Sequence, residues 1–339
     1  MRAAVSANDF NRDLFSQSIG HACWNNIDTK NKFKTLWQQF ALLSVIERQS
    51  VFERINNGQI IQRYFCDSSH PFPDIKPDAL NQKLADLTKH LFTRTKDLAE
   101  VRDACDGETI QQHFNNFCEK NGYLCPVCGT ELLAQLRSNT DDEDQWRGPY
   151  DHLLSKDKYP TFTIHPDNLI PICHTCNSKA KGAKQLLFKK THGGVERRRS
   201  SFYPHTEHCR DLVRVELNGD ALSLQLTVLW DVADLELSEK MTSWTEVYQV
   251  KQRVEGTQAD FIVWIASDCQ PESYDDFIQQ LRRKAIPPSY QVIRSECFKF
   301  WRFKLYHWIA QQSDDFKQQL WAMINQRRSD EDSRLVYGI

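Results

Sequence analysis

Two short segments decide how this chain folds: LCPVCG at residues 124–129 and NLIPICHTCNSK at residues 168–179. Each contains a Cys-x-x-Cys pair, in which a tight turn can direct both sulfur atoms to one point. The four thiol side chains are those of Cys125, Cys128, Cys173 and Cys176. Together they match the ligand set of one tetrahedral Zn²⁺ ion, so the sequence predicts a structural zinc site.

The two pairs are unusually far apart in the sequence. Residues 129–172 separate them, a span more than twice the roughly 15–20 residues of an ordinary zinc ribbon. A pair of redox motifs is the alternative, but neither pair has the βαβ surroundings that such a motif needs. We therefore expect a further structure, built between the two halves of the zinc site, and this insert contains Asp151, His152 and Asn168.

The order of these residues resembles the HNH endonucleases. The matching features are a Cys-x-x-Cys pair, then Asp-His, then Asn-Leu-x-Pro-x-Cys-x-x-Cys-Asn-x-Lys. Residues 153–160 resemble the variant common in bacteria and phages, and the resemblance covers about residues 121–190. It implies a treble-clef-like ββα-metal core, in which a short hairpin and a helix surround one divalent cation, while the zinc ion only joins the hairpin to the helix.

The resemblance also implies a role for each residue. His152 is expected to be the general base, because a neutral imidazole can accept a proton from water near pH 7. Asp151 and Asn177 are expected to bind a catalytic Mg²⁺ or Mn²⁺ ion through oxygen atoms, which such hard cations prefer. Asn168 is expected to tie down the loop that orients His152. His174 is expected to lie at the surface or around the zinc ligands.

A basic segment follows the motif. Residues 178–200 contain eight basic residues and one acidic residue, although the whole chain has 43 Lys and Arg against 45 Asp and Glu, for a net charge of −2. Basic residues next to a nuclease motif favour contacts with phosphates, although an ordinary solvated surface is the alternative. We expect DNA contacts from Lys179, Lys181, Lys184, Arg197, Arg198 and Arg199. RNA is a less favoured substrate.

The fold class expected is α+β. Residues 1–120 show helical periodicity, with Phe33 to Ile46 forming one apolar face. Residues 121–190 form the zinc-containing core. Residues 191–339 are expected to begin with a hairpin at 212–230, turning at Asn218-Gly219-Asp220. Helices are expected to follow at 238–254, 274–284, 293–311 and 314–327, the last capped by Ser313, whereas 261–266 fits a strand or a helix.

The composition limits the other classes. No apolar run approaches the ~20 residues that span a bilayer, and no secretory signal is visible, so we expect a cytoplasmic protein without a membrane partner. The chain has 11 Cys residues, an odd number that does not suit a disulfide framework. Outside the two pairs, we expect these cysteines to be small buried side chains. A second metal site within His205–Cys209 is the alternative for Cys209.

These observations predict a metal-dependent endonuclease that hydrolyses DNA with His152 as base. HNH proteins with large unnamed flanking regions often belong to phage-defence operons, so an ATPase or sensor encoded in the same operon is an expected partner. A homing or phage-encoded nuclease is the competing context. The competing function is a zinc-stabilised module that binds nucleic acid or protein and has an inactive nuclease site.

Overall fold

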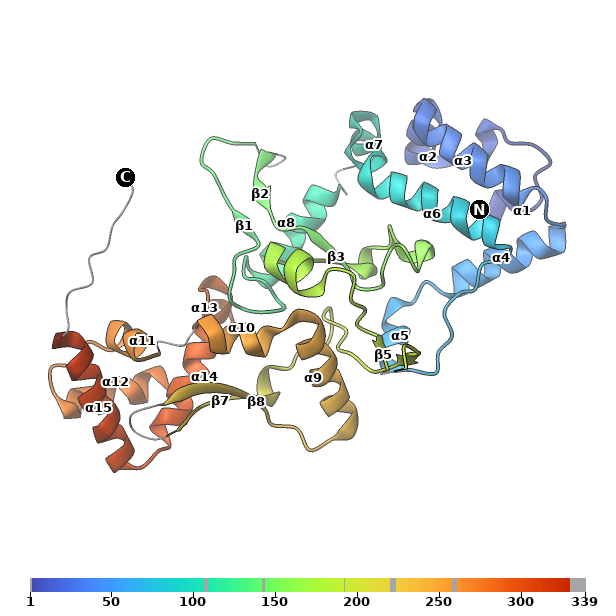
Figure 1. Ribbon diagram of the computed structural model, residues 1–339. Helices are drawn as coiled ribbons and strands as arrows, with labels where there is room; N and C mark the ends of the chain where they lie inside the picture. Colours follow the sequence, from blue (N-terminus) through green and yellow to red (C-terminus); the bar gives the residue numbers. More distant parts are fainter. Residues whose placement is uncertain are drawn as a thin grey trace.

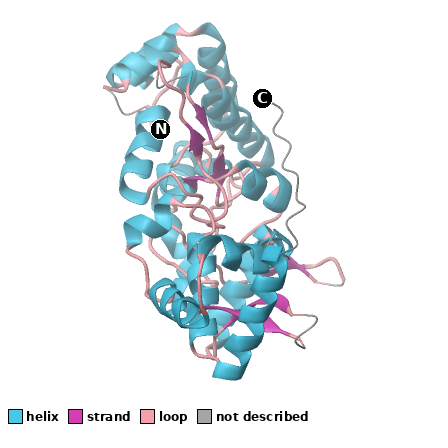
Figure 2. Ribbon diagram, turned by 90° about the vertical axis from the view of Figure 1, so that its left-hand side faces the viewer, coloured by secondary structure: helices cyan, strands magenta, loops and turns pink. Residues whose placement is uncertain are grey.

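The computed structural model describes residues 2–106, 109–141, 144–191, 193–219, 224–257 and 261–329. It has mixed α and β structure, in which helices predominate and the strands of the described ranges form two-stranded sheets. Figure 1 shows the N-terminal helices at one end, the C-terminal helices at the other, and the segment with the two Cys pairs between them. Figure 2 shows the strands as short elements among helices.

The N-terminal part is helical, as expected. Its helices are α1 (Arg2–Val5), α2 (Gln17–Asn25), α3 (Ile27–Phe40), α4 (Val45–Asn57), α5 (Ile61–Cys66), α6 (Asp78–Thr93), α7 (Ala99–Ala104) and α8 (Ile110–Asn121). Helix α6 is amphipathic, and its Leu80, Leu84 and Leu87 are buried. Its last turns pack against the short 3₁₀ helix η4 (Pro160–Phe162), so α6 reaches the middle segment.

The single apolar face predicted for residues 33–46 is wrong at its C-terminal end. Helix α3 ends at Phe40, and α4 begins after Ser44, which forms a capping box with Glu47. The Glu47 carboxylate accepts from the Ser44 backbone N–H at 2.7 Å, and this reciprocal bonding starts a new helix in another direction. Ile46 is therefore 83% exposed, whereas Phe40 is only 4% exposed.

Besides the 3₁₀ helices η4 and η5 (Pro166–Asn168), the middle segment contains short strands and a π-helix. These are β1 (Ala134–Gln135), β2 (Trp146–Arg147), β3 (Tyr150–His152), β4 (Leu169–Pro171), the π-helix η6 (Thr175–Lys181), β5 (Phe188–Lys190) and β6 (Glu196–Arg198). β1 pairs with β2, β3 with β4, and β5 with β6, all antiparallel. The chain runs from β4 directly into η6 through Cys173, so one continuous segment joins a hairpin to a helix.

The C-terminal part begins with the predicted hairpin. β7 (Val213–Asn218) pairs with β8 (Gln225–Trp230), while Asp220 of the predicted turn lies outside the described residues. The helices that follow are α9 (Leu235–Tyr248), α10 (Val250–Thr257), α11 (Phe261–Asp268), α12 (Tyr274–Lys284), α13 (Tyr290–Ser295), α14 (Lys299–Ala310) and α15 (Asp314–Ser329). The open choice at 261–266 is thereby settled as a helix. Ser313 accepts from the Phe316 N–H at 3.2 Å, which confirms the predicted N-cap.

Two of the predicted C-terminal helices are each divided. The helix expected at 238–254 breaks at Gln249, whose positive φ of 54° ends α9 before α10 begins. The helix expected at 293–311 is interrupted between α13 and α14, where Phe298 also has a positive φ of 63°. Hydrophobic periodicity continued across both breaks, so it could not reveal them.

The largest cluster of buried apolar side chains extends from Ile61 to Ile324 and includes the four paired cysteines. Two tryptophan side chains, from α9 and α14, also donate hydrogen bonds to the backbone of the first Cys-x-x-Cys turn. The indole N–H of Trp244 donates to the Val127 carbonyl at 3.3 Å, and that of Trp301 donates to the Cys128 carbonyl at 2.8 Å. The C-terminal helices therefore support the turn that holds the first Cys pair.

The seven cysteines outside the two Cys-x-x-Cys pairs differ in burial. Cys23, Cys118 and Cys269 are buried, as expected, and Cys105, Cys209 and Cys297 are half-buried. Cys66 is exposed at the end of α5, so the expectation of burial is wrong for this residue. None of the helices in the described ranges is both long enough and apolar enough to cross a membrane.

Candidate functional site

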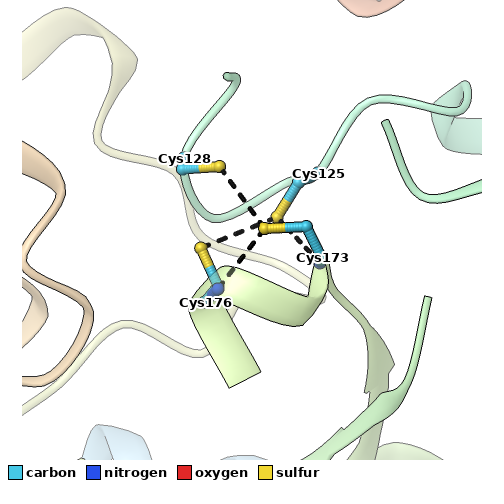
Figure 3. Close-up of side chains that lie close together, drawn as sticks. All are labelled: Cys125, Cys128, Cys173 and Cys176. Carbon is cyan, nitrogen blue, oxygen red and sulfur yellow. Dashed lines mark hydrogen bonds between the residues drawn. The ribbon is translucent and has the colours of Figure 1, made fainter. Parts of the chain in front are cut away.

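The two Cys-x-x-Cys pairs meet at one buried point (Figure 3). All four sulfur atoms lie within 4.8 Å of one another. The Sγ atoms of Cys125 and Cys176 are 4.0 Å apart, and those of Cys128 and Cys173 are 3.9 Å apart. Four sulfurs placed ~2.3 Å from a central Zn²⁺ would be roughly 3.8 Å apart. The cluster could therefore bind a metal ion such as zinc.

Local geometry explains how each pair turns. The Gly129 N–H donates to the Cys125 carbonyl at 2.9 Å, and Gly129 has a positive φ of 65°, a conformation that favours glycine. In the second pair, the Cys176 N–H points at the Cys173 sulfur at 3.4 Å, at the start of η6. These bonds aim both sulfurs of each pair at the same point, as the sequence predicted.

Arg253, from helix α10, contacts the cysteine cluster. The Arg253 guanidinium donates to the Cys176 sulfur at 3.1 Å and to the Glu131 carboxylate at 2.9 Å. Glu131 also accepts from the Thr175 hydroxyl at 3.0 Å. Four thiolates around Zn²⁺ would carry a net charge of −2, so the half-buried Arg253 guanidinium would reduce the cost of burying that charge. No motif in the sequence predicts this contact.

The Asp-His pair lies on β3, in register with β4. Asp151 faces Ile170, and His152 faces Leu169 across the two strands. Successive side chains of a strand point to opposite faces, and here they enter different surroundings. The His152 side chain contacts η4 and α6, whereas the Asp151 side chain contacts η6 and α9.

His152 is held by one hydrogen bond and one aromatic contact. Its Nε2 lies 3.0 Å from the Thr163 carbonyl oxygen. A carbonyl can only accept, so Nε2 carries the hydrogen, and Nδ1 is left as the acceptor in the neutral ring. Burial, and after it the positive charge of nearby Lys156, lower the pKa of His152 to about 4. The ring of Phe92, from α6, packs against the imidazole edge to face at 4.6 Å, and His152 is only 9% exposed.

Asn168 is fully buried and binds only backbone groups. Its side-chain oxygen accepts from the Leu154 N–H at 2.7 Å. Its side-chain nitrogen donates to the carbonyls of Leu154 and Phe162, both at 3.0 Å. The side chain thus joins the two ends of the loop that carries η4, next to the Thr163 carbonyl that binds His152.

Asp151 lies in a buried ion pair. Its Oδ1 accepts from the Lys181 ammonium at 2.5 Å, and its Oδ2 accepts from the Tyr248 hydroxyl at 2.9 Å. Lys181 also donates to the His152 carbonyl at 2.7 Å. Burial, with the Asp151 carboxylate nearby, raises the pKa of the Tyr248 hydroxyl well above its usual range, so this group stays a donor. Both carboxylate oxygens are therefore engaged within the protein.

Asn177 lies in the first turn of η6. Its backbone carbonyl accepts from the Gly182 N–H at 2.9 Å, an i to i+5 bond that defines a π-helical turn. One such turn separates Asn177 from Lys181, so the two residues lie along the same side of η6. His174, at the N-cap of this helix, is exposed, as predicted.

The expected DNA-contacting residues divide into two groups. Lys179, Lys184 and Arg197 are exposed. Lys181 and Arg199 are buried, so neither side chain lies on the surface in this conformation. Arg199 donates to Glu246 and to the carbonyls of Gln185 and Leu186.

Arg198 is also turned inward. Its guanidinium stacks on Phe72 at 4.4 Å and donates to the Tyr64 carbonyl, so it is engaged within the protein in this conformation. Arg197 and Arg198 are consecutive in β6, and strand geometry sends one side chain outward and the next inward. The local charge of the sequence therefore overstates the basic surface.

Comparisons with known proteins give one partial similarity to report. No protein-family model matches this chain, and no solved structure matches it. The chain is 24% identical over 157 residues to protein ea31 of Escherichia phage lambda. The matched part spans 46% of this chain and 43% of ea31, less than half of either protein.

Proposed function

We propose that this protein is a metal-dependent endonuclease of the HNH type, which hydrolyses phosphodiester bonds in DNA with His152 as general base. The observation that carries the proposal is the state of His152. Its Nε2 is bound to the Thr163 carbonyl, and its pKa lies near 4, so the ring is neutral with Nδ1 as acceptor at neutral pH. The β3–β4 hairpin that leads into η6 supports a ββα arrangement.

In this mechanism, His152 Nδ1 takes a proton from the attacking water. The imidazolium that forms keeps its Nε2–H bond to the Thr163 carbonyl, which stabilises the positive charge and fixes the ring. Asn168 holds the loop that presents this carbonyl. In this mechanism, His152 transfers the proton, and Thr163 and Asn168 orient its ring.

The carboxylate of Asp151 and the amide of Asn177 are oxygen ligands of the kind that a hard divalent cation prefers. Such an ion would stabilise the negative charge that develops on the phosphate. In this conformation, the Lys181 ammonium occupies Asp151 Oδ1. A cation at Asp151 must therefore replace Lys181, and this exchange is part of the proposal.

The closed state of the site supports a second candidate function. His152 is 9% exposed and Asp151 is 3% exposed, so neither group meets a phosphate in this conformation. A protein that only binds nucleic acid or another protein, with the cysteine cluster as its structural centre, would need no opening. The endonuclease requires the end of α6, with Phe92, to move away from His152.

A supercoiled-plasmid assay separates the two candidates. The wild-type protein should nick or linearise the plasmid with Mg²⁺ or Mn²⁺ and not with EDTA. His152→Ala should reduce the rate by about 10²–10⁴-fold, as is usual for a general base. His21→Ala, at an exposed histidine of α2, is the matched control and should retain the wild-type rate.

Cleavage that survives in His152→Ala would reject this mechanism. Absence of cleavage of DNA in every metal, with retained binding, would favour the binding module. A parallel assay with single-stranded and double-stranded RNA decides whether RNA is the better substrate.

We also propose that this activity affects phage infection of bacteria, because the partial similarity is to a phage protein. Cells that express the wild-type chain, alone or with an ATPase encoded beside it, should differ in phage plaque counts from cells that express His152→Ala. Equal counts in all cases would remove this part of the proposal.

A further inference from the structure

The core of the N-terminal helices is divided in two. One cluster of buried side chains lies around Phe40 and Leu84, from α3 and α6. The other lies around Phe15 and Cys23, next to α2 and α7. A cavity of about 370 Å³ lies between helices α3, α4 and α6, and both clusters contribute to its walls. Figure 1 shows these helices together at the N-terminal end of the molecule.

The walls of the cavity are almost wholly apolar. Five aromatic side chains line it: Phe10, Phe15, Phe33, Trp37 and Phe40. Leucine, isoleucine and valine side chains from α3, α4 and α6 make most of the remaining surface. The residues that line the cavity, all within the described part of the chain, include no charged side chain, and the hydroxyls are those of Ser16 and Thr88.

The size and the lining together limit the occupant. An apolar cavity of ~150 Å³ stays dry and binds benzene. By proportion, a cavity of about 370 Å³ has room for roughly fifteen non-hydrogen atoms. Binding pockets for small molecules begin at ~300 Å³ and are lined mainly by apolar and aromatic groups. Water is a poor occupant, because it needs two to four polar partners.

We propose that this cavity binds an uncharged aromatic small molecule. The aromatic walls offer edge-to-face and stacked contacts, as Phe15 and Phe33 already make with each other at 4.9 Å. The absence of charged lining residues excludes a carboxylate or ammonium ligand, since burying such a group without a partner is costly. The proposal does not depend on nuclease activity.

The position of the cavity connects an occupant to His152. Helix α6 contributes Leu84, Leu87 and Leu91 to the wall, and the next residue, Phe92, covers the imidazole. Ile164 also lines the cavity and directly follows Thr163, whose carbonyl binds His152. An occupant therefore touches both elements that surround the histidine.

The test uses the chain of residues 1–339, supplied with zinc, and the uncharged aromatic dye N-phenyl-1-naphthylamine, whose fluorescence rises in apolar surroundings. The wild-type protein should bind the dye saturably, at one site. Leu84→Trp places a larger ring in the cavity and should weaken dye binding at least tenfold. Gln82→Trp, on the exposed side of the same helix, is the matched control and should bind as wild type does.

If Leu84→Trp loses helical circular dichroism, Val51→Phe on α4 is the second cavity-filling variant. The proposal is overturned if the wild-type protein gives no saturable signal. It is also overturned if the folded cavity-filling variant and Gln82→Trp bind the dye equally, because the dye would then lie elsewhere on the surface.

Discussion

Replacing Asn168 with alanine should destabilise the protein strongly, although no apolar contact is central to its role. The side chain is 0% exposed and makes three hydrogen bonds to the backbone. The alanine variant removes all three and leaves the N–H and C=O of Leu154 without this partner. The Phe162 carbonyl is affected less, because it also accepts from the His165 N–H at 3.1 Å.

The magnitude follows from these groups. A buried polar group without a partner costs about 1–3 kcal/mol. Two such groups, with a smaller contribution from Phe162, give an expected loss of about 4 kcal/mol in the free energy of unfolding. Asn31→Ala, at an exposed position of α3, should change this free energy by less than about 0.5 kcal/mol.

Urea unfolding at a fixed zinc concentration measures the difference, and Asn168→Asp adds a pH signature. A carboxylate can accept from the Leu154 N–H but cannot donate to the two carbonyls. A protonated carboxyl can donate once, so folding should raise the pKa of the new aspartate. Its destabilisation relative to wild type should therefore be larger at pH 7 than at pH 5. A loss below about 1 kcal/mol for Asn168→Ala would refute the reasoning.

Three further predictions concern the metal cluster and His152. Cys173→Ala should reduce bound zinc from about one ion per chain to much less and increase sensitivity to proteolysis, measured by metal analysis and limited digestion; wild-type protein without zinc would contradict it. Arg253→Gln should keep the fold but weaken zinc binding by about 10–100-fold, measured by competition with a chromophoric chelator, while Arg253→Lys should recover part of the loss. Unchanged affinity in Arg253→Gln would show that the contact with Cys176 is incidental. In metal-free protein, His152 binds protons less readily when folded, so its contribution to stability is complete above about pH 6.5 and is lost as the pH falls towards about 4. The contribution of neutral His152 to the free energy of unfolding is about 3 kcal/mol. In His152→Gln, this free energy should therefore depend less on pH between about pH 4 and about pH 6.5.

The sequence predicted those features whose causes are local. The Cys-x-x-Cys turns depend on residues next to each other, and the structure brings their four sulfurs together. The β7–β8 hairpin follows from alternating apolar residues and a turn signal, and α12 has the predicted bounds, 274–284. Ser313 caps α15 because the cap and the N–H it accepts from are three residues apart.

The rest depends on contacts between distant residues. Arg253 lies 77 residues from Cys176, and Tyr248 lies 97 residues from Asp151. In the sequence, each is an ordinary member of an amphipathic helix, and nothing marks it as a partner of the motif. The basic segment shows the same limit, because counting charges does not reveal that Lys181 and Arg199 are buried in ion pairs.

Residues 168–177 connect the cysteine cluster to the strand beside His152. A change at either end of this segment should therefore disturb the position of the His152 side chain. This segment contains Asn168, which holds the loop, the strand that pairs with His152, and the candidate metal ligands Cys173 and Cys176. Loss of the metal would free one end of β4, and loss of Asn168 would free the other. Either change should shift the register of His152 against Leu169 and displace the imidazole from the Thr163 carbonyl. His152→Ala, in contrast, removes only the proposed base and should leave both ends of the segment fixed. Metal content therefore distinguishes the two kinds of variant: it should be lost with Cys173→Ala, and it should be unchanged with His152→Ala.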